Sequence, residues 1–197
     1  MVHQMEGREF ARYWRAALED PPGREPIYKA VAEKFSVRSA LYPGCGMDAV
    51  PSLAIPYVVY LDNGPFAPRY FQDRERLLKA ISKRKHYDGP CSLEFYEVDY
   101  NDPPPDMPQF DLLLSQYAGP VSQAMKRFLK PGGILMVAEG PEDARLAAQS
   151  PDLELVGTVC RWPDGVQIDP QLLPPQFVQL EDGFKVPIER NFCFRKI

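Results

Sequence analysis

A glycine loop between two apolar runs constrains the fold of this chain most. Residues 40–42 lead into Gly44-Cys45-Gly46, and a second apolar run, residues 57–61, ends on Asp62. Nucleoside ligands are held in this way at the carboxyl edge of a parallel sheet, because glycines without a Cβ let the backbone approach the ligand. An acid at the tip of the next strand accepts hydrogen bonds from the ribose hydroxyls. The stretch therefore predicts a nucleoside site.

The rest of the chain alternates between strand and helix patterns. Strands are expected over residues 92–98, 110–114, 134–137, 153–159 and 191–195. Helices are expected over residues 70–81, 121–129 and 141–148. This order predicts a single α/β domain over residues 1–197, with an open, mostly parallel sheet and helices on both faces.

Two segments extend this core. Apolar stripes over residues 10–18 and 27–35 predict two helices within residues 1–36, before the first strand. These helices either cover an edge of the sheet or form a lid over the ligand, and the pattern leaves both interpretations open. Residues 161–189 are rich in proline and have little periodicity. They predict a mostly irregular insertion packed over one end of the sheet.

Composition limits the partners. A net charge of −4 over 197 residues argues against a general nucleic-acid binder. The four cysteines form no C-x-x-C pair, so no metal site is predicted. Residues 1–7 are polar and no apolar run approaches the ~20 residues of a membrane span, which predicts a cytoplasmic protein with reduced thiols. The oligomeric state is not addressed by any pattern.

Five motifs occur in order from residue 38 to the C-terminus: L-Y-P-G-C-G, Y-V-V-Y-L-D, E-V-D-Y, F-D-L-L-L-S-Q and F-L-K-P-G-G-I-L-M-V. Together they resemble the class I S-adenosylmethionine-dependent methyltransferases, and the L-K-P-G-G turn before a strand is the most specific of them. The resemblance implies a Rossmann-like sheet with a reversed C-terminal strand. It also implies S-adenosylmethionine as the cofactor and a small-molecule substrate, which the sequence does not identify.

The resemblance further implies that the cofactor lies across the tips of several strands. The glycine loop would hold its amino-acid portion and sugar, Asp62 its ribose, and Asp99 the amino group of its adenine. The whole implied set is Gly44, Cys45, Gly46, Asp62, Asn63, Asp99, Tyr100, Ser115 and Gln116. From the residues alone, Asp99 could equally cap the loop that follows it. Tyr117 and Glu139 follow strand ends and are candidates to face a substrate or simple loop residues.

Two positions depart from the family pattern. Tyr42 stands where the family carries an acid two residues before its first glycine, and Asp48 replaces its third glycine. Asp48 either caps the helix that follows or repels the carboxylate of the cofactor. Asp48→Gly is accordingly expected to leave binding unchanged or to strengthen it. No histidine lies at a strand tip to act as a general base, but methyl transfer can proceed by proximity and alignment alone.

Two other functions stay open. The altered glycine loop and the missing base would suit a non-catalytic module that keeps the fold and binds a nucleoside. Gly44-x-Gly46-x-x-Ala49 also fits the dinucleotide fingerprint, with Asp62 on the ribose, which would suit an NAD(P)-dependent oxidoreductase. The L-K-P-G-G turn, the N-terminal helices and the lack of room for a separate substrate domain argue against the oxidoreductase.

Overall fold

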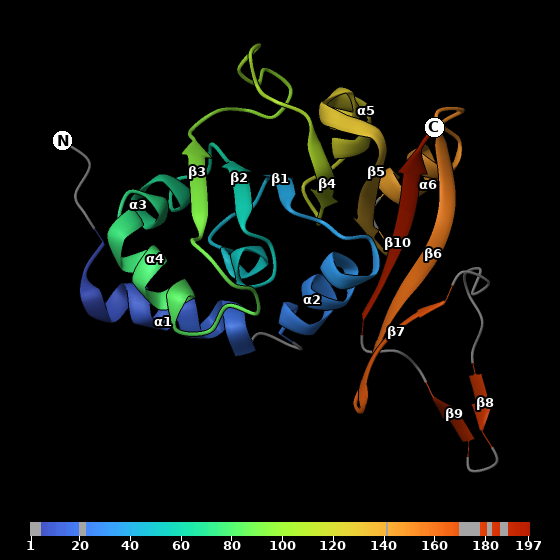
Figure 1. Ribbon diagram of the computed structural model, residues 1–197, viewed down its shortest axis with the longest axis horizontal. Helices are drawn as coiled ribbons and strands as arrows, with labels where there is room; N and C mark the ends of the chain where they lie inside the picture. The colour runs from blue at the N-terminus through green and yellow to red at the C-terminus, as the bar shows by residue number, and fades with distance from the viewer. Residues whose placement is uncertain (1–4, 20–22, 141, 170–177, 181–182, 186–188) are drawn as a thin grey trace.

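An eight-stranded sheet forms the centre of the molecule (Figure 1), in the order β3-β2-β1-β4-β5-β10-β6-β7. The computed structural model describes residues 5–19, 23–140, 142–169, 178–180, 183–185 and 189–197. The strands are β1 (Ser39–Pro43), β2 (Tyr57–Leu61), β3 (Ser92–Tyr96), β4 (Phe110–Ser115), β5 (Leu129–Ala138), β6 (Leu153–Trp162), β7 (Gly165–Asp169) and β10 (Glu189–Lys196). A separate pair consists of β8 (Val178–Leu180) and β9 (Gly183–Lys185).

The strand directions are those expected for an open, mostly parallel α/β sheet. Strands β3, β2, β1, β4 and β5 run parallel to one another. β10 runs antiparallel to both of its neighbours, β5 and β6. The predicted mostly parallel sheet with a reversed C-terminal strand is therefore confirmed.

Helices cover both faces of this sheet (Figure 1). One face carries α1 (Gly7–Glu19), α2 (Glu25–Lys34), the 3-10 helix η1 (Val50–Leu53), α3 (Ala67–Phe71) and α4 (Arg74–Ser82). The other carries α5 (Val121–Met125), the 3-10 helix η2 (Lys126–Phe128) and α6 (Glu142–Ala148). Successive residues of the central strands alternate between the two cores, as Tyr60 and Leu61 do in β2. Burial on both faces explains why these strands are continuous apolar runs.

The helix expected over residues 70–81 is interrupted. Asp73 leaves the helical conformation, with φ −84° and ψ 57°, and its side chain accepts a hydrogen bond from the backbone N–H of Arg76. This is an N-cap, so α3 ends before Asp73 and α4 begins after it. The apolar stripe continues across the break, which is why the sequence pattern does not show it.

Residues 161–189 are less irregular than expected in the part that the structure describes. β6 continues to Trp162, and the two-residue turn Pro163-Asp164 leads into β7, which pairs with β6 so that Trp162 faces Gly165. Val166 and Ile168 pack against the core, whereas Gly165 and Gln167 are exposed. This alternation stabilises an extra edge strand, but it is too short to be recognised among the prolines.

The N-terminal helices α1 and α2 lie on the face of the sheet that also carries η1, α3 and α4. The rings of Phe10 in α1 and Tyr70 in α3 stack with centroids 5.4 Å apart. α2 packs against η1 and reaches β6 and β7. The last turns of α1 and the start of α2 also lie beside the glycine loop, as described next.

Candidate functional site

The glycine loop lies at the carboxyl end of β1, packed tightly on one side and open on the other. Gly44 and Gly46 have φ values of +62° and +55°, which favour glycine. A Cβ on Gly44 would lie 2.2 Å from the Cβ of Ala118, in the loop after β4. A Cβ on Gly46 would meet no atom within 4 Å. The loop therefore closes against β4 at Gly44 and leaves free space at Gly46.

Asp62, at the tip of β2, is hydrogen-bonded to this loop. Its Oδ2 accepts a hydrogen bond from the backbone N–H of Gly46 at 2.7 Å, and its Oδ1 accepts one from Gly64 at 2.6 Å. A carboxylate has about four lone-pair sites, so each oxygen keeps one acceptor position. Asp62 thus orders the glycine loop and can still accept hydrogen bonds from a vicinal diol.

A cavity of ≈ 500 Å³ lies beside the loop, between the N-terminal helices and the tip of β4. α1 and the residues before α2 form one wall, so these helices both cover the sheet and enclose the cavity. The lining residues are Tyr13, Ala16, Ala17, Arg24, Tyr42, Gly44, Cys45, Gly46, Met47, Asp48, Gln116 and Tyr117. Cys45 is buried, and burial raises the pKa of its thiol, which favours the neutral form.

Asp48 is the most highly connected group in the cavity wall. Its Oδ1 accepts from the backbone N–H of Val50 at 2.9 Å, a turn contact just before η1. Asp48 is not the cap that one interpretation of the sequence proposed, because the N-cap of η1 is Ala49, which makes no side-chain capping hydrogen bond. Its Oδ2 accepts from the hydroxyls of Tyr28 at 3.0 Å and Tyr42 at 3.3 Å. Burial raises the pKa of Asp48. The sequence predicts that Asp48→Gly leaves cofactor binding unchanged or strengthens it, and this change would also remove all three of these hydrogen bonds.

Arg24 forms part of the rim above Asp48. Its Nε donates to Glu189 at 3.1 Å, and its Nη1 lies 3.9 Å from Oδ2 of Asp48. The guanidinium carbon lies 5.3 Å from the ring centroid of Tyr117, a cation–π arrangement. Tyr117 has a φ of +60° and is 58% exposed. This substrate-side candidate therefore stands at the mouth of the cavity.

Ser115 and Gln116 are neighbours in sequence but face different surroundings. The Ser115 hydroxyl donates to Asp143 in α6, so this side chain is engaged in packing between β4 and α6. Gln116 lines the cavity and donates through Nε2 to Oδ1 of Asn191 at 2.9 Å. Its Oε1 is buried and has no hydrogen-bond partner among the described residues. Of this pair, only Gln116 reaches the cavity wall.

Asn63, Asp99 and Tyr100, like Asp62 itself, are not among the residues that line the cavity. Asp99 accepts from the backbone N–H of Asn101 at 2.8 Å, so it does cap the loop that follows β3. Asn63 lies 3.5 Å from the second oxygen of Asp99. The Tyr100 hydroxyl donates to the carbonyl of Ala118 at 2.7 Å, which ties this loop to the one that packs on Gly44.

Glu139 is held by an ion pair instead of facing the cavity. Its carboxylate accepts from Nε of Arg190 at 2.7 Å and lies 2.6 Å from Nη2 of the same residue. Bidentate pairing of this kind fixes both side chains. The ion pair with Arg190 in β10 therefore holds Glu139 in place, and Glu139 is not among the residues that line the cavity.

Sequence reasoning missed Arg24, which lines the cavity, and also Glu189 and Asn191, which form hydrogen bonds with lining residues. Arg24 precedes Pro26 and is indistinguishable by pattern from any residue before a helix. Glu189 and Asn191 stand at the start of the last strand, and Glu189 is 165 residues from Arg24. No local signal relates these positions, because tertiary packing alone brings them together.

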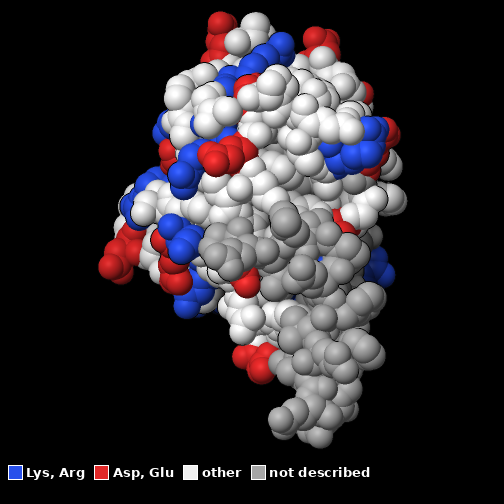
Figure 2. All heavy atoms as spheres, turned by 90° about the vertical axis from the view of Figure 1, so that its right-hand side faces the viewer, with Lys and Arg blue, Asp and Glu red and all other residues white. Residues whose placement is uncertain are grey.

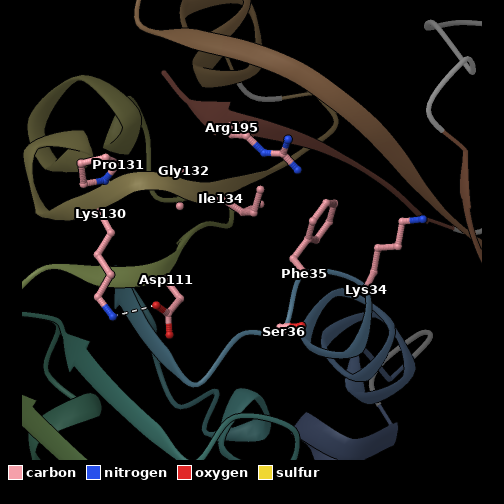
Figure 3. A pocket seen from close by; sticks show the side chains of 10 residues that line it. Lys34, Phe35, Ser36, Asp111, Lys130, Pro131, Gly132, Ile134 and Arg195 are labelled. Carbon is pink, nitrogen blue, oxygen red and sulfur yellow. Dashed lines mark hydrogen bonds and ion pairs between the residues drawn. The ribbon is translucent and has the colours of Figure 1, made fainter.

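A second hollow, of ≈ 360 Å³, lies at the opposite edge of the sheet (Figure 3). Lys34, Lys130 and Arg195 surround it. Asp111 is bound there by Lys130 at 2.7 Å and by the backbone N–H groups of Arg38 and Ser39 at 3.0 and 2.9 Å. Asp111 thus joins the starts of β1, β4 and β5. This edge carries none of the predicted site residues, and ligands of open α/β sheets bind at the other one.

The surface is mixed in charge. Figure 2 shows acidic and basic side chains interspersed on the described part of one face, without a continuous basic area. Among the described residues, no group of three or more His, Cys, Asp or Glu side chains is placed to hold a metal ion. No described helix has both the length and the apolar character that a membrane crossing requires.

Compared by sequence, the chain matches no protein-family model and no curated protein. Its fold matches many solved structures. The N-methyltransferase NodS from Bradyrhizobium japonicum WM9, solved with S-adenosyl-L-homocysteine, is 16% identical over 96% of this chain and 97% of its own, with a TM-score of 0.55. The O-methyltransferase TomG from Streptomyces achromogenes, solved with SAM, is 10% identical over 100% of this chain and 93% of its own, with a TM-score of 0.53.

The tRNA (m1A58) methyltransferase TrmI from Aquifex aeolicus is also similar, with 14% identity, 88% of this chain and 69% of its own covered, and a TM-score of 0.50. Identities this low are informative about the fold alone. The fold that the sequence motifs implied is thereby confirmed, and this chain has the fold of the class I S-adenosylmethionine-dependent methyltransferases.

Proposed function

We propose that the protein is an S-adenosylmethionine-dependent methyltransferase acting on a small molecule. The observation that carries the proposal is the position of Asp62, which is bonded to the open glycine loop at the carboxyl edge of the sheet and keeps free acceptor positions. A ribose diol is the ligand group that such an acid recognises. Fold neighbours solved with S-adenosyl-L-homocysteine or SAM support the same assignment.

The residues of the site fit this cofactor. The free space at Gly46 leaves room for the ligand to approach the backbone. Asn63 and Asp99, which are in contact after the tips of β2 and β3, would bind the adenine, and the cavity beside the glycine loop would hold the amino-acid portion. S-adenosylmethionine would supply an activated methyl group on its sulfonium.

A small substrate is inferred from the shape and chemistry of the cavity. Helix α1 covers it, and Tyr117 stands at its mouth. Burial raises the pKa of Tyr42 and of Cys45, so neither group is charged near neutral pH to act as a base. The walls would hold the acceptor and exclude water, and the transfer would depend on proximity and alignment.

The oxidoreductase alternative is weakened by the turn after the glycine loop. Dinucleotide sites place the pyrophosphate at the N-terminus of a full helix. Here the loop leads into η1, which has only four residues, and the carboxylate of Asp48 accepts a hydrogen bond from its first backbone N–H, that of Val50. A negative side chain at that position would repel a pyrophosphate.

Calorimetric titration with S-adenosylmethionine, S-adenosylhomocysteine and NAD⁺ tests the proposal. We expect both adenosyl ligands to bind and NAD⁺ not to. Asp62→Asn should weaken binding about tenfold or more, because a charge-assisted hydrogen bond is worth about 1.5–3 kcal/mol. Asp88→Asn, an exposed change at the other edge of the sheet, is the control and should have no effect.

Binding of NAD⁺ alone, or of no nucleoside tighter than about millimolar, would overturn the proposal. Adenosyl binding that is insensitive to Asp62→Asn would mean that the pocket lies elsewhere. Turnover is measured as release of S-adenosylhomocysteine with a panel of hydroxyl, thiol, carboxylate and amine acceptors. Binding without turnover on any of them would favour the non-catalytic module.

A further inference from the structure

Two opposite charges line the cavity beside the glycine loop: Asp48, at the position of the family's third glycine, and Arg24, from outside the loop. Asp48 supplies a carboxylate and Arg24 a guanidinium, and Nη1 of Arg24 lies 3.9 Å from Oδ2 of Asp48. At this distance the two groups attract each other but share no hydrogen bond. The side chain of Arg24 is 31% exposed and that of Asp48 is 18% exposed, so both are accessible only in part.

Arg24 keeps unused hydrogen-bonding capacity. Its Nε donates to Glu189, whereas its two terminal nitrogens donate no hydrogen bond within the described part of the chain. A guanidinium has five N–H donors in a planar fork, a geometry that suits carboxylates. Arg24 is therefore held in place by one acid while its free edge can receive another.

Asp48, in contrast, receives no hydrogen bond from a charged donor among the described residues. Its hydrogen bonds come from neutral donors, namely the hydroxyls of Tyr28 and Tyr42 and the backbone N–H of Val50. The nearest cation, Arg24, is already paired more closely with Glu189. One guanidinium thus faces two carboxylates, so this wall carries an excess of negative charge that a cation would balance.

The position of Asp48 also accounts for the unusual residue at position 42. Tyr42 stands where the family carries its acid, and its hydroxyl donates to Asp48. The carboxylate is thereby within hydrogen-bond reach of the side chain at position 42, although it comes from the far end of the loop. The two departures from the family pattern are therefore joined by a hydrogen bond, which places the carboxylate of Asp48 beside position 42.

From this arrangement we infer that Asp48 and Arg24 bind the α-ammonium and the α-carboxylate of the ligand's amino-acid portion. This inference rests on the proposed function and adds the two residues that recognise the charged end of the cofactor. An α-amino acid carries its opposite charges one carbon apart, and the two side chains present the complementary pair within one cavity wall. Glu189 then acts as a positioning residue that holds Arg24.

Four ligands separate the contributions. S-adenosylhomocysteine has both charges, its decarboxylated analogue only the ammonium, its deaminated analogue only the carboxylate, and 5′-methylthioadenosine neither. We expect the wild type to bind S-adenosylhomocysteine at least about tenfold more tightly than 5′-methylthioadenosine. Asp48→Asn should lower affinity about tenfold only for ligands with the ammonium, and Arg24→Gln only for ligands with the carboxylate. Neither change should alter binding of 5′-methylthioadenosine.

Asparagine at position 48 can still accept from Val50 and donate to a tyrosine hydroxyl, so this variant should fold, which circular dichroism checks. Tyr42→Glu/Asp48→Gly returns the acid to the family's position and should restore the preference for the ammonium. Loss of affinity that is independent of the matching ligand group, or equal binding of all four ligands by the wild type, would overturn the inference and leave the proposed function intact. If 5′-methylthioadenosine and the other three ligands all fail to bind, the proposed function and this inference both fall.

Discussion

Replacing Gly44 by alanine tests how tightly the glycine loop is packed, and Gly46→Ala is its matched comparison. Both glycines have a left-handed φ, so alanine is strained at either position. Only the Cβ at position 44 would collide, at 2.2 Å from the Cβ of Ala118, whereas the one at position 46 would enter open space. The two substitutions share a conformational cost and differ in a steric one.

The magnitudes follow from these two terms. A left-handed conformation costs a non-glycine residue about 1–2 kcal/mol. Overpacking a well-filled site costs about 1–3 kcal/mol more. The free energy of unfolding should therefore fall by about 1–2 kcal/mol in Gly46→Ala and by about 2–5 kcal/mol in Gly44→Ala. Urea unfolding measures both, and each 1 kcal/mol should also lower Tm by about 2–4 °C in a chain of this size.

Ala118→Gly removes the colliding atom and provides the rescue. The double variant Gly44→Ala/Ala118→Gly should regain the steric part, which appears as a coupling of about 1–3 kcal/mol in the mutant cycle. A coupling below about 0.5 kcal/mol would refute the reasoning, since it would mean that the loop moves away from Ala118. Gly46→Ala, although folded, should bind S-adenosylhomocysteine more weakly because its Cβ would occupy the space left for the ligand.

Two further predictions concern pH. Because burial raises the pKa of Asp48, its charge is lost at a higher pH than that of an ordinary aspartate, whose pKa is about 3.9. Affinity for S-adenosylhomocysteine should therefore fall as the pH is lowered from neutral towards that value, and Asp48→Asn should flatten this dependence in calorimetric titrations. The pKa of Asp111 is lowered overall. Burial acts to raise it, but hydrogen bonds from Lys130 and from two backbone N–H groups lower it by more than burial raises it. Its contribution to stability should be complete above its unfolded pKa of about 3.9 and lost as pH falls through the folded value, so Asp111→Asn should destabilise the protein at neutral pH and less in acid, as urea midpoints would show.

The succession of strands and helices along the chain could be predicted from the sequence because its apolar runs are unusually clear. Each central strand is buried on both faces and reads as a block bounded by turn residues, as residues 57–61 do before Asp62. The break at Asp73 and the strand β7 were missed for opposite reasons. The apolar stripe continues through the break, and the alternation in β7 spans only five residues.

The candidate site likewise has a part that the sequence could predict and a part that it could not. The glycine loop and Asp62 are linked through short segments of chain, so a motif could locate them. Arg24 and Glu189 come from the start of α2 and the start of β10, and only the folded sheet brings them together. The role of Asp48 could not be read from the loop alone, because the hydroxyl of Tyr28 comes from another helix.

Strand β10 lies between β5 and β6, although it follows both of them in the chain. During synthesis from the N-terminus, the parallel half of the sheet therefore ends at a bare edge on β5, and the β6–β7 hairpin has no strand through which to join it. Insertion of β10 closes that gap and in the same event delivers Glu189 to Arg24. A chain stalled before residue 189 would hold the glycine loop and Asp62 but lack Glu189 beside Arg24, so it should bind the ligand more weakly than a chain that includes β10.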